Sequence, residues 1–134
     1  MGRIAAIDYG LKRVGIAISD ASKKIAFPYK TVPGGKQAVT EVKKALQGQP
    51  IEKILVGYPL LMNGKKGDMA LVVEKFAEAL REALQLEVFL RDERLSSRGA
   101  EASLKEISLN RKQRSERMDE TAATLLLQSF LDET

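Results

Sequence analysis

The chain has 134 residues, which predicts a single domain over 1–134, and its 44% hydrophobic and 30% charged residues exclude a mainly disordered protein. No apolar run nears the roughly 20 residues that cross a bilayer, so we expect a cytoplasmic protein without a membrane partner. Cys and His are absent, which excludes disulfides, Cys/His zinc sites and thiol or imidazole catalysis. The formal net charge of +4, with basic residues concentrated in 1–36 and 105–117, favours a polyanionic partner, although a solvated charged surface is the commoner reason for such an excess.

The first half of the chain predicts a three-stranded meander followed by a helix. Near-continuous apolar residues indicate a strand buried on both faces over 3–8 and a second strand over 14–18. A third strand over 25–32 contains Pro28, which favours an edge position. Apolar residues at helical spacing then predict a helix over 38–46.

The second half predicts alternating strands and helices. Strands are expected over 51–57 and 87–91, and helices over 69–84, 99–107 and 115–131, with Asp68 and Ser115 as the N-caps of two of them. The loop over 58–67, which carries Lys65 and Lys66, is expected to form a mobile flap.

This order of elements predicts an α/β sheet with helices on both faces. Right-handed crossovers then place the carboxyl ends of the strands over 3–8 and 51–57 side by side, at the edge where open α/β sheets bind ligands. Asp8 ends the first of these strands. A carboxylate there either forms the following turn or binds a cation, and position alone favours neither interpretation.

Two further acidic positions lie at expected strand or helix ends. Asp92 and Glu93 follow the last strand, and because side chains alternate along a strand only one of them can share a site with Asp8; a surface ion pair is the simpler interpretation. Asp119 falls on the apolar stripe of the last helix, whereas Glu120, Thr124 and Gln128 fall on the opposite face, which we expect to be solvated.

Three carboxylates at one edge would repel each other and raise their pKa values unless cations lie between them. If Asp8, Glu93 and Asp119 converge, two Mg²⁺ or Mn²⁺ ions about 4 Å apart would relieve the repulsion and support in-line hydrolysis of a phosphodiester. This chemistry requires neither His nor Cys.

Four parts of the chain resemble, in order and at appropriate spacing, the motifs of the YqgF (RuvX) family. They are IDYGLKRVGIAISD at 7–20, VGYPL at 56–60, DERLSS at 92–97, and MDETAA at 118–123 with LLQ at 126–128. The resemblance implies a ribonuclease H-like fold: a mixed five-stranded sheet in the order 3-2-1-4-5, with strand 2 antiparallel. It also implies a metal-dependent nuclease that processes the 5′ end of pre-16S rRNA or, in an older description, resolves Holliday junctions.

By motif, the family's catalytic and metal-binding acids correspond to Asp8, Glu93 and Asp119, with Asp92 as second choice for the middle position. The sequence departs from the family pattern at Leu11, Leu61 and Asn63, where Thr, Asn and Asp are expected. These departures leave the carboxylates untouched but put substrate preference in question.

Substrate contacts are expected from three basic residues near the same edge: Lys12, Arg13 and Arg94. The expected partner is nucleic acid, either structured RNA such as pre-rRNA or branched DNA, and no dimer seam is evident, so we expect a monomer or weak homodimer. Two other interpretations remain. One is a phosphotransferase related to actin and sugar kinases, although one domain is too little for their two-domain ATP clasp; the other is a non-catalytic nucleic-acid-binding module.

Overall fold

A mixed sheet of five strands organises the chain, in the order β3-β2-β1-β4-β5. The computed structural model describes residues 2–61, 63–93 and 111–133, with side chains described throughout except in 111–121. The elements are β1 (Arg3–Tyr9), β2 (Arg13–Ser19), β3 (Ala26–Pro33), the short 3-10 helix η1 (Gly35–Gln37), α1 (Ala38–Leu46), β4 (Ile51–Tyr58), α2 (Asp68–Leu84), β5 (Glu87–Asp92) and α4 (Arg111–Asp132).

The strand directions confirm the predicted fold. β2 is antiparallel to both β1 and β3, whereas β1, β4 and β5 run parallel to one another. The strand that contains Pro28 lies at the edge of the sheet, as predicted, where a missing N–H removes no ladder hydrogen bond. The carboxyl ends of β1, β4 and β5 therefore meet at one edge, which we call the carboxyl edge.

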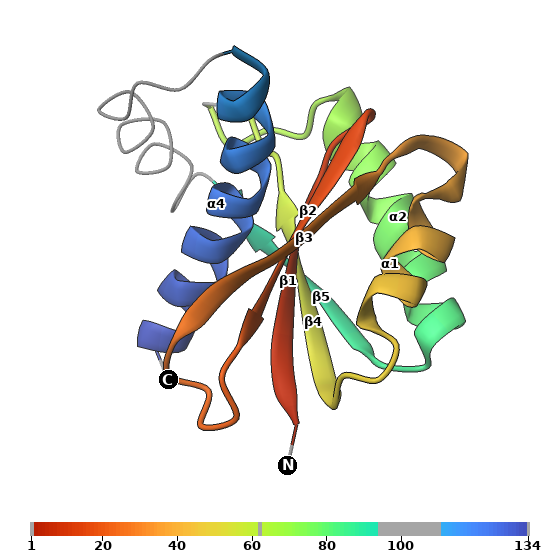
Figure 1. Cartoon of the computed structure of the whole chain (residues 1–134). Coiled ribbons are helices and arrows are strands. Elements are labelled where there is room, and N and C mark those ends of the chain that lie inside the picture. Colours follow the sequence, from red (N-terminus) through yellow and green to blue (C-terminus); the bar gives the residue numbers. More distant parts are fainter. Residues whose placement is uncertain (1, 62, 94–110, 134) are drawn as a thin grey trace.

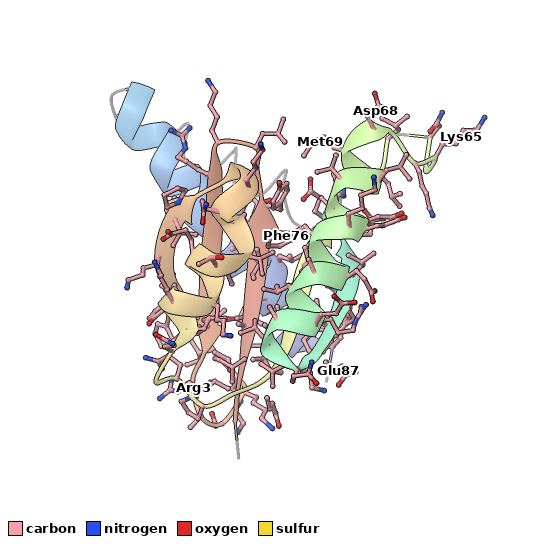
Figure 2. All side chains as sticks on the ribbon, turned by 90° about the vertical axis from the view of Figure 1, so that its right-hand side faces the viewer. Arg3, Lys65, Asp68, Met69, Phe76 and Glu87 are labelled. Carbon is pink, nitrogen blue, oxygen red and sulfur yellow. The ribbon has the colours of Figure 1, made fainter. Side chains whose placement is uncertain are left out.

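Helices cover both faces of the sheet, α1 and α2 on one side and α4 on the other (Figure 1). The middle of β1 is apolar because it contributes to both cores: Ala5 and Ile7 pack toward α1 and α2, and Ile4 and Ala6 pack toward α4. Phe76 of α2 points at the sheet in Figure 2, where its ring lies 4.5 Å from that of Tyr9, centroid to centroid. The alternation along β1 assigns every residue of this strand, including Asp8, to one face.

Two local predictions are wrong, and a third concerns residues outside the described part of the chain. Asp68 is the first residue of α2 rather than its N-cap; the extended Gly67 takes that position without a side-chain hydrogen bond. Ser115 lies inside α4, which already begins at Arg111 in the part of the chain that the structure describes. The helix expected over 99–107 falls outside the described residues.

Gln128 of α4 is half-buried rather than on a solvated face. Its Oε1 accepts a hydrogen bond of 2.9 Å from the backbone N–H of Ala26, and its Nε2 donates one of 2.9 Å to the carbonyl of Lys24. The side chain thus ties α4 to the start of the edge strand, which the spacing of polar residues alone did not indicate. Within the described part of the chain, no helix is both long enough and apolar enough to cross a membrane.

Candidate active site at the carboxyl edge

Asp8 lies near the end of β1 on the face that α4 covers. It is half-buried, and its partner in register on β2 is Gly15. On the other side Ile7 pairs with Val56, so Gly57 of β4 follows next to Asp8. The carboxylate therefore has a residue without a side chain on each neighbouring strand, which leaves space around it in an otherwise filled layer.

Glu93 reaches the same face from the end of β5. Two residues earlier, Arg91 donates hydrogen bonds of 3.3 and 3.2 Å to Ser129 of α4, which fixes this face of β5 as the α4 side. The side chain of Glu93 shares a hydrogen bond with that of Asp8. Two ionised carboxylates can only accept hydrogen bonds, so this contact requires a proton or a cation between them.

The electrostatics of Glu93 agree with this geometry. Burial raises the pKa of the Glu93 carboxyl above its usual range, the negative charge of Asp92 raises it further, and the hydrogen bond with Asp8 lowers it in part. A carboxyl held in this way gives up its proton reluctantly unless a positive charge arrives. Such a group is typical of functional sites.

Gly57 forms the floor beneath Glu93. A Cβ atom at position 57 would lie 2.9 Å from Glu93 Oε2 and 3.5 Å from Glu93 Cβ, and 3.4 Å from Leu126 Cδ2 of α4. The first distance is shorter than a van der Waals contact. Only glycine leaves the carboxylate where it is.

The structure separates the two candidates for the middle acid. Asp92 is the register partner of Tyr58, whose hydroxyl donates a hydrogen bond to Glu74 of α2, so alternation places Asp92 on the α2 face. Glu93, one residue later, is the acid that meets Asp8.

Two of the remaining predicted site residues, Asp119 and Arg94, have side chains outside the described residues. Asp119 lies in α4 one helical turn before the buried Ala123, but its side chain is outside the described residues, as is the whole of Arg94. Among the residues whose side chains are described, no group of three acids is close enough to hold a metal ion. The structure thus brings together two of the three predicted carboxylates and leaves the third as a prediction.

Lys12 and Arg13 lie where the β1–β2 hairpin turns. Lys12 is exposed and Arg13 half-buried, and the carbonyl of Lys12 accepts a 2.9 Å hydrogen bond from the N–H of Gly34. Gly34 itself lies so close to the turn that a Cβ there would be 2.7 Å from the carbonyl oxygen of Leu11. The hairpin tip is therefore packed against the chain that follows β3, beside the carboxyl edge.

Three features of this face were not assigned any role from the sequence. Gly15 and Gly57 both lie in recognised motifs, and a glycine inside an apolar strand was the available signal for a close approach. Thr31 of β3 pairs with Gly15, and its hydroxyl is buried without a hydrogen-bond partner in the described structure. No sequence signal distinguished Thr31.

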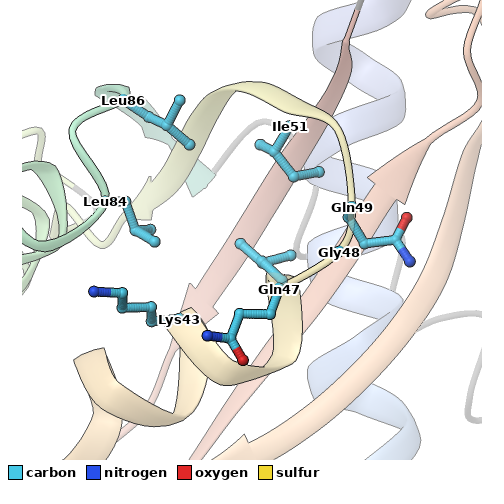
Figure 3. A pocket seen from close by; sticks show the side chains of 8 residues that line it. Lys43, Gln47, Gly48, Gln49, Ile51, Leu84 and Leu86 are labelled. Atoms are coloured by element: carbon cyan, nitrogen blue, oxygen red, sulfur yellow. The ribbon is translucent and has the colours of Figure 1, made fainter.

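A pocket of about 240 Å³ lies at the opposite edge of the sheet. Figure 3 shows it between the last turns of α1 and α2 and the start of β4, with Lys43, Leu84 and Leu86 among its lining residues. Its wall contains no carboxylate. It is separate from the pair of Asp8 and Glu93.

The chain resembles known proteins in sequence over nearly its whole length. The sequence model of the family described as "RuvX: Holliday junction resolvase" matches residues 2–133. A relative from Desulfitobacterium hafniense named "Putative pre-16S rRNA nuclease" is 40% identical over 130 residues, covering 97% of this chain and 92% of the relative. One of the same name from Syntrophomonas wolfei is 43% identical over 132 residues, covering 97% and 94%.

Solved structures share the fold at much lower identity. The fowlpox virus Holliday junction resolvase aligns with a TM-score of 0.59 at 12% identity, covering 98% of both chains. Thermus thermophilus RuvC in complex with a Holliday junction substrate aligns with a TM-score of 0.58 at 15% identity, covering 99% of this chain and 96% of that one. These likenesses confirm the ribonuclease H-like sheet predicted from the sequence.

Proposed function

Because the chain belongs to the RuvX family, we propose that it is a metal-dependent endonuclease that hydrolyses phosphodiester bonds and processes the 5′ end of pre-16S rRNA. The observation that carries the proposal is the hydrogen-bonded pair of Asp8 and Glu93 at the carboxyl edge. The fold delivers these carboxylates from strands that are far apart in the sequence, at the edge where α/β sheets bind their ligands.

The chemistry of this pair fits a divalent cation. Glu93 is half-buried against Gly57, has a raised pKa and faces a second carboxylate, so a positive charge at this point would offset the cost of burial and the repulsion. Carboxylate oxygens without imidazole or thiolate are the donors that Mg²⁺ and Mn²⁺ prefer. We propose Asp8, Glu93 and Asp119 as the residues that hold two such ions.

When bound, divalent cations increase the acidity of water and stabilise negative charge on the leaving oxygen. The chain's own residues supply the rest. Gly57 leaves room for the Glu93 carboxylate, Gly15 adds no side chain beside Asp8, and the hairpin tip offers Lys12 and Arg13 to backbone phosphates on the β2 side. Arg94 is proposed for the same role beside Glu93.

The substrate proposal rests on the relatives' name. A pre-16S rRNA substrate would place the enzyme in the cytoplasm and would be compatible with action as a monomer or weak homodimer. Cleavage of a four-way DNA junction is the second candidate, because the family model carries the description of a Holliday junction resolvase. Symmetric cleavage of a junction would require two copies of the chain.

One experiment distinguishes these functions. An RNA that spans the 5′ end of mature 16S rRNA with its leader, and a four-way DNA junction, are each incubated with the protein in Mg²⁺, in Mn²⁺ and in EDTA. Metal-dependent cleavage of the RNA alone supports the proposal, and cleavage of the junction alone supports the resolvase. If neither substrate is cut although both are bound, the chain is a non-catalytic binding module.

A further inference from the structure

Residues 63–66, which we call the Lys65 turn, form a small hydrogen-bonded turn that contacts α2 through Lys66. The backbone N–H of Lys65 donates a 3.0 Å hydrogen bond to Oδ1 of Asn63, and its carbonyl accepts one of 2.9 Å from Leu61. Gly64 has φ of +82°, a left-handed conformation that suits glycine at the bend. A bridge between Leu60 and Lys66 closes this small antiparallel turn.

Glu74 of α2 anchors the Lys65 turn to the body of the protein. Its Oε2 accepts a 2.6 Å hydrogen bond from the Tyr58 hydroxyl and lies 3.0 Å from Lys66 Nζ. These contacts lower the pKa of Glu74 and, because the carboxylate is ionised, raise the pKa values of Tyr58 and Lys66. The exposed ammonium of Lys66 is therefore paired with a carboxylate of the protein itself.

The neighbouring Lys65 has the opposite environment. Its side chain is exposed, and its ammonium has no carboxylate or carbonyl partner among the described residues. Figure 2 places Lys65 beside Asp68, at the end of the molecule opposite Arg3 and Glu87, the residues that begin β1 and β5. This end contains the carboxyl edge.

In the strand order, Lys12 and the Lys65 turn lie on opposite sides of β1, the strand that carries Asp8; the turn is held on the α2 side of the sheet, whereas Asp8 lies on the α4 side. Lys12 follows β1 on the side of β2, whereas the Lys65 turn follows β4, and β1 with Asp8 lies between β2 and β4 in the sheet. A polyanion that crosses the edge above Asp8 would meet a lysine on each side. Tyr58, which anchors the turn, directly follows Gly57, the floor of Glu93.

We propose that Lys65 binds a backbone phosphate of the nucleic acid and that Glu74 is a positioning residue that holds the Lys65 turn in place by binding Lys66 and Tyr58. The proposal rests on the nuclease function proposed above. An exposed ion pair adds little to folding stability, so the contact between Glu74 and Lys66 has its main effect on where the turn lies.

The sign of one effect separates positioning from simple electrostatics. Glu74→Ala removes a negative charge near a polyanion, so electrostatics alone predicts tighter binding. Positioning predicts weaker binding, because the turn loses the carboxylate that holds Lys66. Glu78→Ala is the matched control: it removes an exposed negative charge one turn further along α2, where Glu78 pairs with Arg81. Glu74→Gln keeps an acceptor oxygen and should restore part of the affinity.

The measurement is fluorescence anisotropy of a labelled single-stranded 20-nucleotide RNA in metal-free buffer between 50 and 300 mM KCl, with every variant built on Asp8→Asn so that cleavage does not interfere. Lys65→Ala should raise Kd severalfold and reduce the slope of log K against log salt by about 0.7, the value for one phosphate contact on a single strand. Lys43→Ala, exposed at the opposite edge of the sheet, should change neither.

The proposal is overturned if Lys65→Ala leaves the salt slope unchanged, or if Glu74→Ala tightens binding as much as Glu78→Ala. Because this is a binding measurement, its outcome is independent of the cleavage assay. If the RNA is cleaved but Lys65→Ala does not change binding, only this inference is refuted. If Lys65→Ala weakens binding but the protein cleaves no substrate, only the proposed nuclease function is refuted.

Discussion

Gly57→Ala is the substitution that tests most directly whether Glu93 works where the structure places it. The new Cβ would lie 2.9 Å from Glu93 Oε2, whereas a relaxed contact is about 3.4 Å, so the carboxylate must move by about 0.5 Å. A displacement of about 1 Å at a reacting centre costs about 100-fold in rate. We therefore expect kcat for RNA cleavage to fall by about 10-fold to 100-fold.

The fold should tolerate the same change. Oε2 is the end of a flexible side chain, and the contact with Leu126 Cδ2, at 3.4 Å, is only tight. Replacing glycine in a strand also reduces the entropy of the unfolded chain, which contributes about 0.4–1 kcal/mol in favour of folding. The free energy of unfolding should stay within about 1 kcal/mol of the wild type, equivalent to a shift of about 4 °C in Tm.

The assay pairs cleavage rates with thermal unfolding, and Gly10→Ala serves as the contrasting variant. A Cβ at Gly10 would lie 2.6 Å from the backbone carbonyl oxygen of Arg13, which cannot swing away, so we expect a loss of about 1–3 kcal/mol in stability. Full activity of Gly57→Ala, or an activity loss matched by an equal loss of stability, would refute the reasoning.

Three further predictions concern Asp8, Glu93 and Gln128. Asp8→Asn should abolish cleavage while RNA affinity stays equal or increases, because a negative charge facing phosphate is removed; weaker binding in a filter assay would contradict this. The raised pKa of Glu93 means that the folded protein holds this proton more tightly than the unfolded chain, so in metal-free buffer the free energy of unfolding should fall as pH rises above about 4.5. Chemical denaturation at pH 4 and pH 8 measures this fall, and Glu93→Gln should remove part of it. Gln128→Ala leaves the N–H of Ala26 without its acceptor and should cost about 1 kcal/mol in urea unfolding, whereas an unchanged midpoint would show that water replaces the contact.

The sheet could be predicted from the sequence because its strands carry strong local signals. β1 contains the apolar run 4–7 followed by Asp8, and Pro28 identifies the edge strand. Helix starts were less predictable: Asp68 and Ser115 are typical capping residues, yet the cap of α2 is backbone geometry at Gly67, and α4 simply begins earlier. A polar residue that a distant backbone satisfies, such as Gln128, gives no periodic signal at all.

The candidate site was predictable to the level of residue type. Alternation implied that one of Asp92 and Glu93 would face Asp8, but which one depends on the register of β5 against β4, a tertiary property. The importance of Gly57 could not be predicted from one sequence, because it depends on the absence of a Cβ atom beneath the side chain of a residue 36 positions later in the chain. The ion pair between Lys66 and Glu74 was likewise not predictable from the sequence.

The row formed by Gly15, Asp8 and Gly57 has a consequence for heat tolerance. Three adjacent strands give no aliphatic side chain to the α4 core at this level, whereas a single buried valine there would contribute about 1.5–3 kcal/mol. The protein therefore has less buried apolar surface, and less stabilisation from it, at the point where its carboxylates meet. Substitutions meant to raise the melting temperature are therefore best placed away from this row, where they do not disturb the carboxylates.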